Sequence, residues 1–229
     1  MPVRKKAPED LTAKKALALE VIRRLKAEYP DAGCTLDYDH AWQLLVSVRL
    51  AAQCTDARVN IVVEELFAKY PSVAALAAAE PEDIEAIVKP CGLGHSKARD
   101  ISACMRMLRD KYDCKVPTTF EELLALPGVG RKSANLIMGD VFGKPAIVTD
   151  THCIRLCNKI GLVDGIKEPQ KVEMALWKII PPEEGSDLCH RFVMHGRAVC
   201  NARKPECEKC CLKDICRTAR EAAGQQAEP

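Results

Sequence analysis

The chain has 229 residues, of which 34 are Lys or Arg and 32 are Asp or Glu, so its formal net charge is only +2. With 48% hydrophobic and 29% charged residues, the composition excludes a globally disordered or collagen-like chain, and the length allows one or two domains. No apolar run reaches the roughly 18 residues that a membrane span needs, and residues 1–10 lack the apolar stretch of a secretory signal. We therefore expect an intracellular, cytoplasmic protein without membrane contact.

The chain contains 13 cysteines, which is a high number for its length. In a reducing compartment, many cysteines favour metal binding over disulfides. The odd number also argues against a complete disulfide framework. The cysteines therefore predict a metal centre.

Apolar residues recur at helical spacing along almost the whole chain, which predicts an all-α fold. Asp56 is a candidate N-cap, Pro81 suits a first helical position, and Thr119 with Glu122 fits a capping box. One short strand-like piece, 146–149, cannot form a sheet by itself. Helices are expected at 17–29, 40–53, 56–69, 81–88, 96–111, 119–126, 131–142, 150–160, 169–180 and 186–199.

Two segments share the pattern Gly-apolar-Gly, then three residues, then Ala: 91–98 and 127–134. Each lies at the junction of two predicted helices. Gly-x-Gly is common at turns, so the first copy is equally consistent with an ordinary helix connection.

The second copy, with Gly128, Val129 and Gly130, is the more specific of the two. Glycines allow positive φ and expose consecutive N–H groups. Together with the N-terminus of the following helix, these groups suit a DNA phosphate. The segment resembles the helix–hairpin–helix motif of the DNA glycosylase superfamily, in which Val129 packs between the two helices.

Lys132 follows in the first turn of the next helix, beside Arg131. The positive helix N-terminus and the neighbouring cation disfavour a second positive charge, and hence favour the neutral amine. A neutral amine can attack a sugar carbon and form a Schiff base. The alternative is a solvated or phosphate-contacting lysine.

Asp150 stands at the predicted start of a helix, where a carboxylate suits an N-cap. The same carboxylate is able to deprotonate an amine or to stabilise a positive, sugar-like transition state. His152, in the same helix, is interpreted as a packing or phosphate-contacting residue rather than a general base.

Four cysteines near the C-terminus follow the spacing C-x6-C-x2-C-x5-C: Cys200, Cys207, Cys210 and Cys216. Four thiolates suit either a zinc ion or a [4Fe–4S] cluster, and the single C-x2-C pair favours the cluster only modestly. The spacing resembles the cluster loop of the endonuclease III family. Cys211 adjoins Cys210 and competes with it as a ligand, but Cys210 preserves the spacing.

The segment 189–220 around these cysteines holds eight Lys or Arg against three acids, a net +5, whereas segment 34–144 has a net charge of −2. The near-neutral total therefore hides a basic region. This region is a candidate surface for the DNA backbone, or else a solvated rim that offsets the cluster's negative charge.

The hairpin, the aspartate segment and the four-cysteine loop occur in the order found in the endonuclease III family, and the resemblance covers nearly all of 12–218. It implies two helical domains with a DNA-binding cleft between them, across which Lys132 and Asp150 face each other. The implied domains are a six-helix domain at 34–144 with the helix–hairpin–helix at about 120–142 and a cluster domain of 1–33 plus 145–218. The polar composition of the last residues separately predicts a frayed tail at 219–229.

The resemblance further implies base excision repair by a bifunctional DNA glycosylase and abasic-site lyase acting on oxidised pyrimidines. The damaged base is flipped out, Lys132 attacks C1′ with help from Asp150, and β-elimination breaks the strand. Gln53 matches the residue that fills the vacated space, and Leu93 matches an apolar wedge. The implied partner is double-stranded DNA with damaged pyrimidines or abasic sites, bound by a monomer that carries a [4Fe–4S] cluster. The implied DNA contacts are Gln53, Leu93, Gly128, Val129, Gly130, Arg131 and His152.

The sequence is also compatible with two other functions. The adenine-mismatch glycosylase branch resembles this chain but usually lacks the lysine and carries a glutamate five residues before the position of Gln53, where this chain has Val48. A non-catalytic DNA-binding iron–sulfur protein would use the hairpin as a clamp, and would bind abasic DNA without cleaving it.

Overall fold

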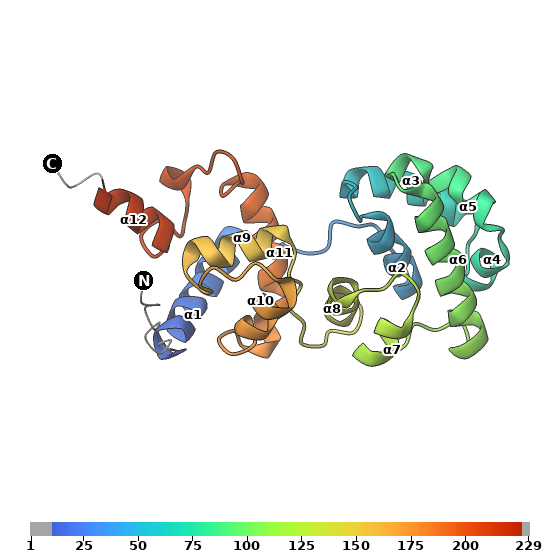
Figure 1. Ribbon diagram of the computed structural model, residues 1–229, viewed down its shortest axis with the longest axis horizontal. Coiled ribbons are helices and arrows are strands. Elements are labelled where there is room, and N and C mark those ends of the chain that lie inside the picture. The colour runs from blue at the N-terminus through green and yellow to red at the C-terminus, as the bar shows by residue number, and fades with distance from the viewer. Residues whose placement is uncertain (1–10, 226–229) are drawn as a thin grey trace, which may run out of the picture. The chain divides into compact units, whose positions relative to one another are not determined.

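The computed structural model describes residues 11–225, which form helices and connecting loops without a β-strand (Figure 1). The predicted all-α fold is confirmed. The chain divides into two compact units. The first combines the chain up to Gly33 with the chain from Pro145 onward, and the second runs from Cys34 to Lys144. No helix among the described residues is long and apolar enough to cross a membrane.

The second unit contains seven α-helices, one more than the six predicted, and all of its residues are described. Its longest helix, α6, packs against both α4 and α5 (Figure 1). The additional helix is α4, where Ser72 Oγ accepts from Ala75 N at 3.1 Å. The helices are α2 (Ala41–Leu50), α3 (Asp56–Lys69), α4 (Val73–Ala78), α5 (Pro81–Val88), the 3-10 turn η1 (Lys89–Cys91), α6 (Gly94–Lys111), α7 (Phe120–Ala125) and α8 (Arg131–Asp140).

Helix α2 is buried on nearly every side, as its continuous apolar sequence predicts. The indole of Trp42 meets the ring of Phe67 edge-on, with 5.1 Å between ring centroids. The start of α2 is held by Gln43, whose Oε1 accepts from His40 N at 2.8 Å. This helix is thus the centre of the second unit, and the turn after it carries Gln53.

Two predicted caps have different outcomes. Thr119 caps α7 as predicted, with its Oγ1 accepting from Glu122 N at 3.3 Å. The prediction of Asp56 as an N-cap is wrong. Thr55 caps α3, and the Asp56 carboxylate instead accepts a 2.6 Å hydrogen bond from Thr35 Oγ1.

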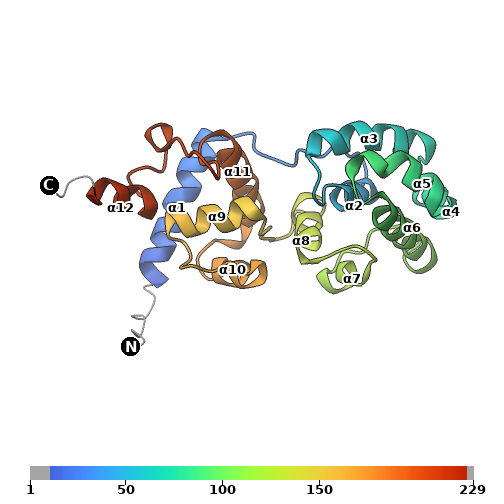
Figure 2. The same cartoon turned by 45° about the horizontal axis from the view of Figure 1, so that its top comes forward.

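The first unit is built around α11, which packs against both α1 and α9 (Figure 2). The strand-like segment 146–149 is buried but pairs with no strand among the described residues. The described helices are α1 (Leu11–Glu28), α9 (Thr151–Ile160), α10 (Pro169–Leu176), the 3-10 turn η2 (Pro182–Glu184), α11 (Gly185–Ala198), the 3-10 turn η3 (Cys207–Lys209) and α12 (Arg217–Gln225).

Helix α12 lies where the sequence predicts a frayed tail from residue 219. Its first residue, Arg217, donates from Nη2 to Asn158 O at 2.7 Å and pairs through Nη1 with Asp164. These contacts anchor the start of α12 on the end of α9 and the loop that follows it. They involve Arg217, which precedes residue 219, so the frayed tail stays a prediction. Residues 226–229 lie outside the described part of the chain.

Candidate functional site

The second Gly-apolar-Gly segment forms the turn between α7 and α8. Gly128 has φ +74°, and Val129 N donates to Leu126 O at 3.1 Å. A Cβ at Gly128 would lie 2.9 Å from Asp100 Cβ and 3.1 Å from Arg49 Cδ, so the turn sits directly on this ion pair. The pair itself joins Arg49 Nε to Asp100 Oδ2 at 2.7 Å. Glycine is therefore required at this position by both backbone and space.

Helix α8 starts on this turn with Gly130 as N-cap, which offers no capping side chain. Val129 is half-buried against the core of the second unit, as the hairpin interpretation expects. An uncapped helix N-terminus on a glycine turn is suited to an anion such as a DNA phosphate.

The two cations at the start of α8 differ in exposure. The Arg131 guanidinium lies over the Phe120 ring, 5.0 Å from its centroid, and Arg131 is half-buried. Lys132, the second residue of α8, is exposed. Its amine is therefore accessible to a ligand in solution.

The structure gives Gln53 and Leu93 an unusual backbone that the sequence does not predict. Both have left-handed conformations, with φ +58° and +51°, and both side chains are exposed. Non-glycine residues seldom adopt positive φ, and such residues cluster at functional sites. Both lie in the second unit, as do the glycine turn and Lys132.

In the first unit, Asp150 caps α9. Its Oδ1 accepts from Cys153 N at 2.7 Å, which confirms the predicted N-cap, and the residue is half-buried. The other oxygen, Oδ2, accepts no hydrogen bond from the described residues. The carboxylate therefore combines a fixed orientation with one oxygen available for other chemistry.

His152 and Arg155 pack α9 against the end of α11. Arg155 Nη2 lies 3.2 Å from His152 Nδ1 and donates to Cys200 O at 2.7 Å. A Cβ at Gly196 would lie 2.3 Å from His152 Nδ1, so the two helices can approach this closely only because residue 196 is glycine. These contacts favour the packing interpretation of His152, and Arg155 holds the start of the cysteine loop.

The four predicted metal ligands, Cys200, Cys207, Cys210 and Cys216, line one pocket. Cys211 is not among the residues that line it, and its carbonyl instead accepts from Arg24 Nη1 at 2.8 Å. No group of three His, Cys, Asp or Glu side chains within 11–225 converges on the position of a single metal ion. Four soft thiol donors around one pocket fit the chemistry of an iron–sulfur cluster.

A buried histidine lies beside this pocket. His195 Nε2 is 3.3 Å from Cys210 Sγ, and His195 Nδ1 is 3.1 Å from Tyr29 Oη. Burial lowers the pKa of His195 and raises the pKa of the Cys210 thiol to about 11. His195 is not predictable from the sequence, because a lone histidine in a helix carries no distinguishing pattern.

Apart from the four predicted ligands and Cys211, eight cysteines remain, and most of them are small core residues: Cys91, Cys104, Cys153, Cys157 and Cys189 are buried. Burial raises the pKa of the Cys104 thiol to about 12. The Cys104 thiol therefore stays protonated at neutral pH.

The basic residues around the cysteine pocket are partly neutralised by neighbouring acids. Lys209 pairs with Glu206 and Lys213 with Glu208, each at 2.5 Å. Arg203, between the first two predicted ligand cysteines, is exposed. The candidate DNA-backbone surface in this segment therefore stays a prediction.

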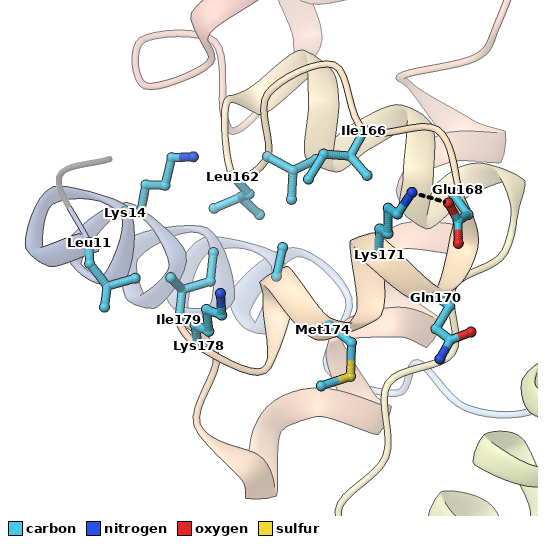
Figure 3. A pocket seen from close by; sticks show the side chains of 12 residues that line it. Leu11, Lys14, Leu162, Ile166, Glu168, Gln170, Lys171, Met174, Lys178 and Ile179 are labelled. Atoms are coloured by element: carbon cyan, nitrogen blue, oxygen red, sulfur yellow. Dashed lines mark ion pairs between the residues drawn. The ribbon is translucent and has the colours of Figure 1, made fainter. Parts of the chain in front are cut away.

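A separate pocket in the first unit lies beside α1 and α10 and contains none of the predicted site residues (Figure 3). An ion pair of 2.6 Å between Lys171 and Glu168 stands at its edge, and the exposed Met174 lines it. Its lining is mainly apolar side chains and the stems of lysines.

Comparison with known proteins agrees with this combination of a helical fold, a glycine turn and a cysteine loop. The model of the HhH-GPD superfamily base excision DNA repair protein matches residues 46–182, so the class is that of helix–hairpin–helix DNA repair enzymes. Endonuclease III of Synechocystis sp. is 42% identical over 210 residues, covering 91% of this chain and 95% of that protein. The chain therefore belongs to the endonuclease III family, and it is a DNA glycosylase and abasic-site lyase of base excision repair.

Solved structures give the same result. A non-covalent endonuclease III–DNA complex superposes with a TM-score of 0.86 at 39% identity, covering 92% of this chain and 98% of that one. A trapped endonuclease III–DNA covalent intermediate has the same TM-score and identity, covering 91% and 98%.

Proposed function

We propose that this glycosylase and lyase removes oxidised pyrimidines from double-stranded DNA and then cleaves the abasic site through a Schiff base on Lys132. The observation that carries the proposal is an exposed lysine amine in the first turn of α8, directly after an uncapped glycine turn. The solved structure of a trapped endonuclease III–DNA covalent intermediate supports a covalent mechanism.

The chemistry requires the amine, the sugar, water, and groups that accept protons from the amine and C2′ and return them to the departing base and the sugar ring oxygen. The Lys132 nitrogen bonds to C1′ of a flipped-out nucleotide, and the base leaves with the electrons of the glycosidic bond. The sugar ring opens to give an iminium. Loss of a C2′ proton then expels the 3′ phosphate, and water releases the enzyme from the cleaved strand. The glycine turn at 127–130 holds a nearby phosphate during these steps.

Asp150 is proposed to assist this reaction. Its Oδ1 is held by Cys153 N, so Oδ2 is the oxygen that would take the proton from the lysine ammonium or stabilise the positive sugar. The protein is further proposed to act as a monomer in the cytoplasm, with Gln53 and Leu93 entering the duplex.

The proposed cofactor is a [4Fe–4S] cluster held by Cys200, Cys207, Cys210 and Cys216, which line one pocket. When bound, the cluster links the four thiolates into one rigid loop. The chain's own contribution is to fix that loop: Arg155 donates to Cys200 O at 2.7 Å, and Thr218 Oγ1, two residues after Cys216, donates to Lys159 O at 2.9 Å. The loop then presents its basic residues to the DNA backbone.

Covalent trapping tests the function. The purified protein, incubated with an abasic-site duplex and borohydride, is expected to form a stable protein–DNA adduct, because reduction captures the Schiff base. The adenine-mismatch glycosylase and the non-catalytic clamp both predict binding without an adduct. Absence of an adduct would sink the lyase mechanism.

Asp150→Asn is expected to lower turnover on a damaged duplex at least about 100-fold, because asparagine cannot accept the proton. Stability should change by less than about 0.5 kcal/mol, since Asn caps a helix as well as Asp does. Single-turnover kinetics and thermal unfolding measure the two effects. Full activity in this variant would reduce Asp150 to a helix cap.

Cys210→Ser and Cys211→Ser form a matched pair for the cluster. Cys210→Ser is expected to lose most iron and sulfide and the visible absorption band, and Cys211→Ser is expected to retain them. Metal analysis and absorption spectra measure both. A colourless wild-type protein with stoichiometric zinc would contradict the cluster, and equal losses in both variants would contradict the choice of Cys210.

A further inference from the structure

Helix α6 buries a charged residue in the core of the second unit. Lys97 is 0% exposed and lies on the same face of α6 as Ile101 and Met105. It forms no ion pair with any of the described residues. A buried charge is costly, so a lysine at a core position indicates a specific use of its ammonium group.

The ammonium bridges the ends of two other helical segments. Nζ donates to Leu50 O at 2.8 Å and to Cys91 O at 2.9 Å. Leu50 is the last residue of α2, and Cys91 is the last residue of η1. Carbonyls at helix ends lack partners within the helix and carry partial negative charge, so one cation satisfies both. Burial lowers the pKa of Lys97, while these two oxygens favour its charged form.

Each of these carbonyls lies two or three positions before an exposed residue with a left-handed backbone. Gln53, with φ +58°, follows Leu50 by three positions, and Leu93, with φ +51°, follows Cys91 by two. Disfavoured backbone conformations persist only where the surrounding structure holds them. Among the hydrogen bonds of the described residues, only those of the Lys97 side chain connect the start of the Gln53 turn to the start of the Leu93 turn.

We propose that Lys97 is a positioning residue that fixes the spacing of the Gln53 turn and the Leu93 turn before DNA binds, and so sets the preference for damaged over undamaged duplex. The inference rests on the proposed entry of Gln53 and Leu93 into the duplex. Gln53 and Leu93 must act on the same disrupted base pair. If their separation is fixed before binding, no binding energy is spent on ordering the two turns, and the affinity for the damaged duplex is higher.

The test compares binding to an undamaged duplex with binding to the same duplex carrying a tetrahydrofuran abasic analogue. The Kd for the undamaged duplex divided by the Kd for the abasic-analogue duplex measures the preference for damage. In Lys97→Met, this ratio is expected to fall at least about tenfold, because the two turns lose the side chain that connects them. The Kd for undamaged DNA should stay within about twofold, since phosphate contacts at the glycine turn are unchanged. An unchanged ratio overturns the proposal.

Leu108→Ala is the matched control for loss of stability. Leu108 is fully buried on the same helix, about 16 Å further along it at 1.5 Å per residue. This variant should lower Tm but keep the ratio of Kd values. An equal fall of the ratio in Leu108→Ala would make the effect a general consequence of instability and overturn the proposal.

Gln53→Ala combined with Leu93→Ala separates this inference from the function on which it rests. If Lys97 acts through these two residues, adding Lys97→Met to the pair should change the ratio less than about twofold further. A wild-type ratio in the Gln53/Leu93 pair contradicts their proposed roles in DNA. A reduced ratio in the pair together with a wild-type ratio in Lys97→Met contradicts only the role of Lys97.

Lys97→Arg covers the case in which Lys97→Met does not fold. It keeps a cationic donor but places it at the end of a longer, planar group, so the spacing of the two turns should change while the buried charge remains. The ratio is expected to shift at least about threefold. A folded Lys97→Arg protein with the wild-type ratio overturns the proposal.

Discussion

The two Gly-apolar-Gly segments of the second unit begin alike and then diverge. Gly92 and Gly128 both have φ +74°. After Gly92, Leu93 takes a left-handed conformation, is 57% exposed, and serves as the N-cap of α6. After Gly128, Val129 is half-buried, and α8 starts one position later in the pattern. The shared pattern thus defines a turn, while the residue at which the helix begins decides whether the apolar side chain faces solvent or core.

The same offset separates the two lysines. Lys97 is the fourth residue of α6 and is fully buried, whereas Lys132 is the second residue of α8 and is exposed. In the aligned pattern the two lysines are one position apart, which is about 100° around a helix, so their side chains leave the helix in different directions. One segment therefore uses its lysine to hold structure, and the other leaves its lysine accessible for chemistry.

The largest expected difference between the segments is chemical. Lys132→Ala should abolish borohydride trapping, because no other amine occupies its position in the turn. Ser96, which aligns with Lys132 in the first segment, is exposed and donates to Leu93 O at 3.2 Å. Ser96→Ala should keep full trapping. An adduct formed by Lys132→Ala at the wild-type rate would remove the chemical distinction between the segments.

The next effect concerns the two leading glycines. Gly128→Ala should cost about 1–3 kcal/mol of stability, because the new Cβ combines a positive φ with a 2.9 Å approach to Asp100. Gly92→Ala should cost about 1 kcal/mol, since it meets the same φ but nothing within 4 Å. Urea unfolding of both variants measures the difference. Equal losses of unfolding free energy in the two variants would show that the Arg49 and Asp100 side chains move aside for the new Cβ at no cost.

The smallest effect concerns the central apolar residues. Val129→Ala should lose about 1 kcal/mol, because it removes half-buried methyl groups from the core. Leu93→Ala should change stability by less than about 0.5 kcal/mol, since the side chain is exposed. Thermal unfolding measures both, and a larger loss in Leu93→Ala would indicate that its side chain packs in the free protein.

The helical fold could be read from the sequence because apolar residues repeat at helical spacing in nearly every long helix. Helix α4 (Val73–Ala78) was missed because it has only six residues and all of them are apolar, so its sequence shows no periodicity. Helix α12 was missed because its polar sequence is held by the contacts of Arg217 rather than by an apolar face.

For the candidate site, the sequence identified residues whose spacing is distinctive or that match the family, but not the backbone conformations at those residues. The Asp150 cap and the four-cysteine spacing follow from local rules. The left-handed backbones of Gln53 and Leu93 cannot be read from non-glycine residues. The position of Lys97 is visible in the sequence, since it lies four residues before Ile101 on the buried face of α6. A single lysine within an apolar face is, however, easily assigned to the surface.

The division of the chain also has a consequence for how the protein folds during synthesis. The second unit is one continuous segment, so it can fold as soon as it leaves the ribosome. Helix α1, in contrast, packs on α11, and the hydrogen bond between Tyr29 and His195 spans 166 residues. Helix α1 is synthesised first, but it can pack on α11 only after nearly the whole protein has been translated. Its buried residues Val21, Ile22 and Leu25 are the ones that a chaperone would shield in that interval.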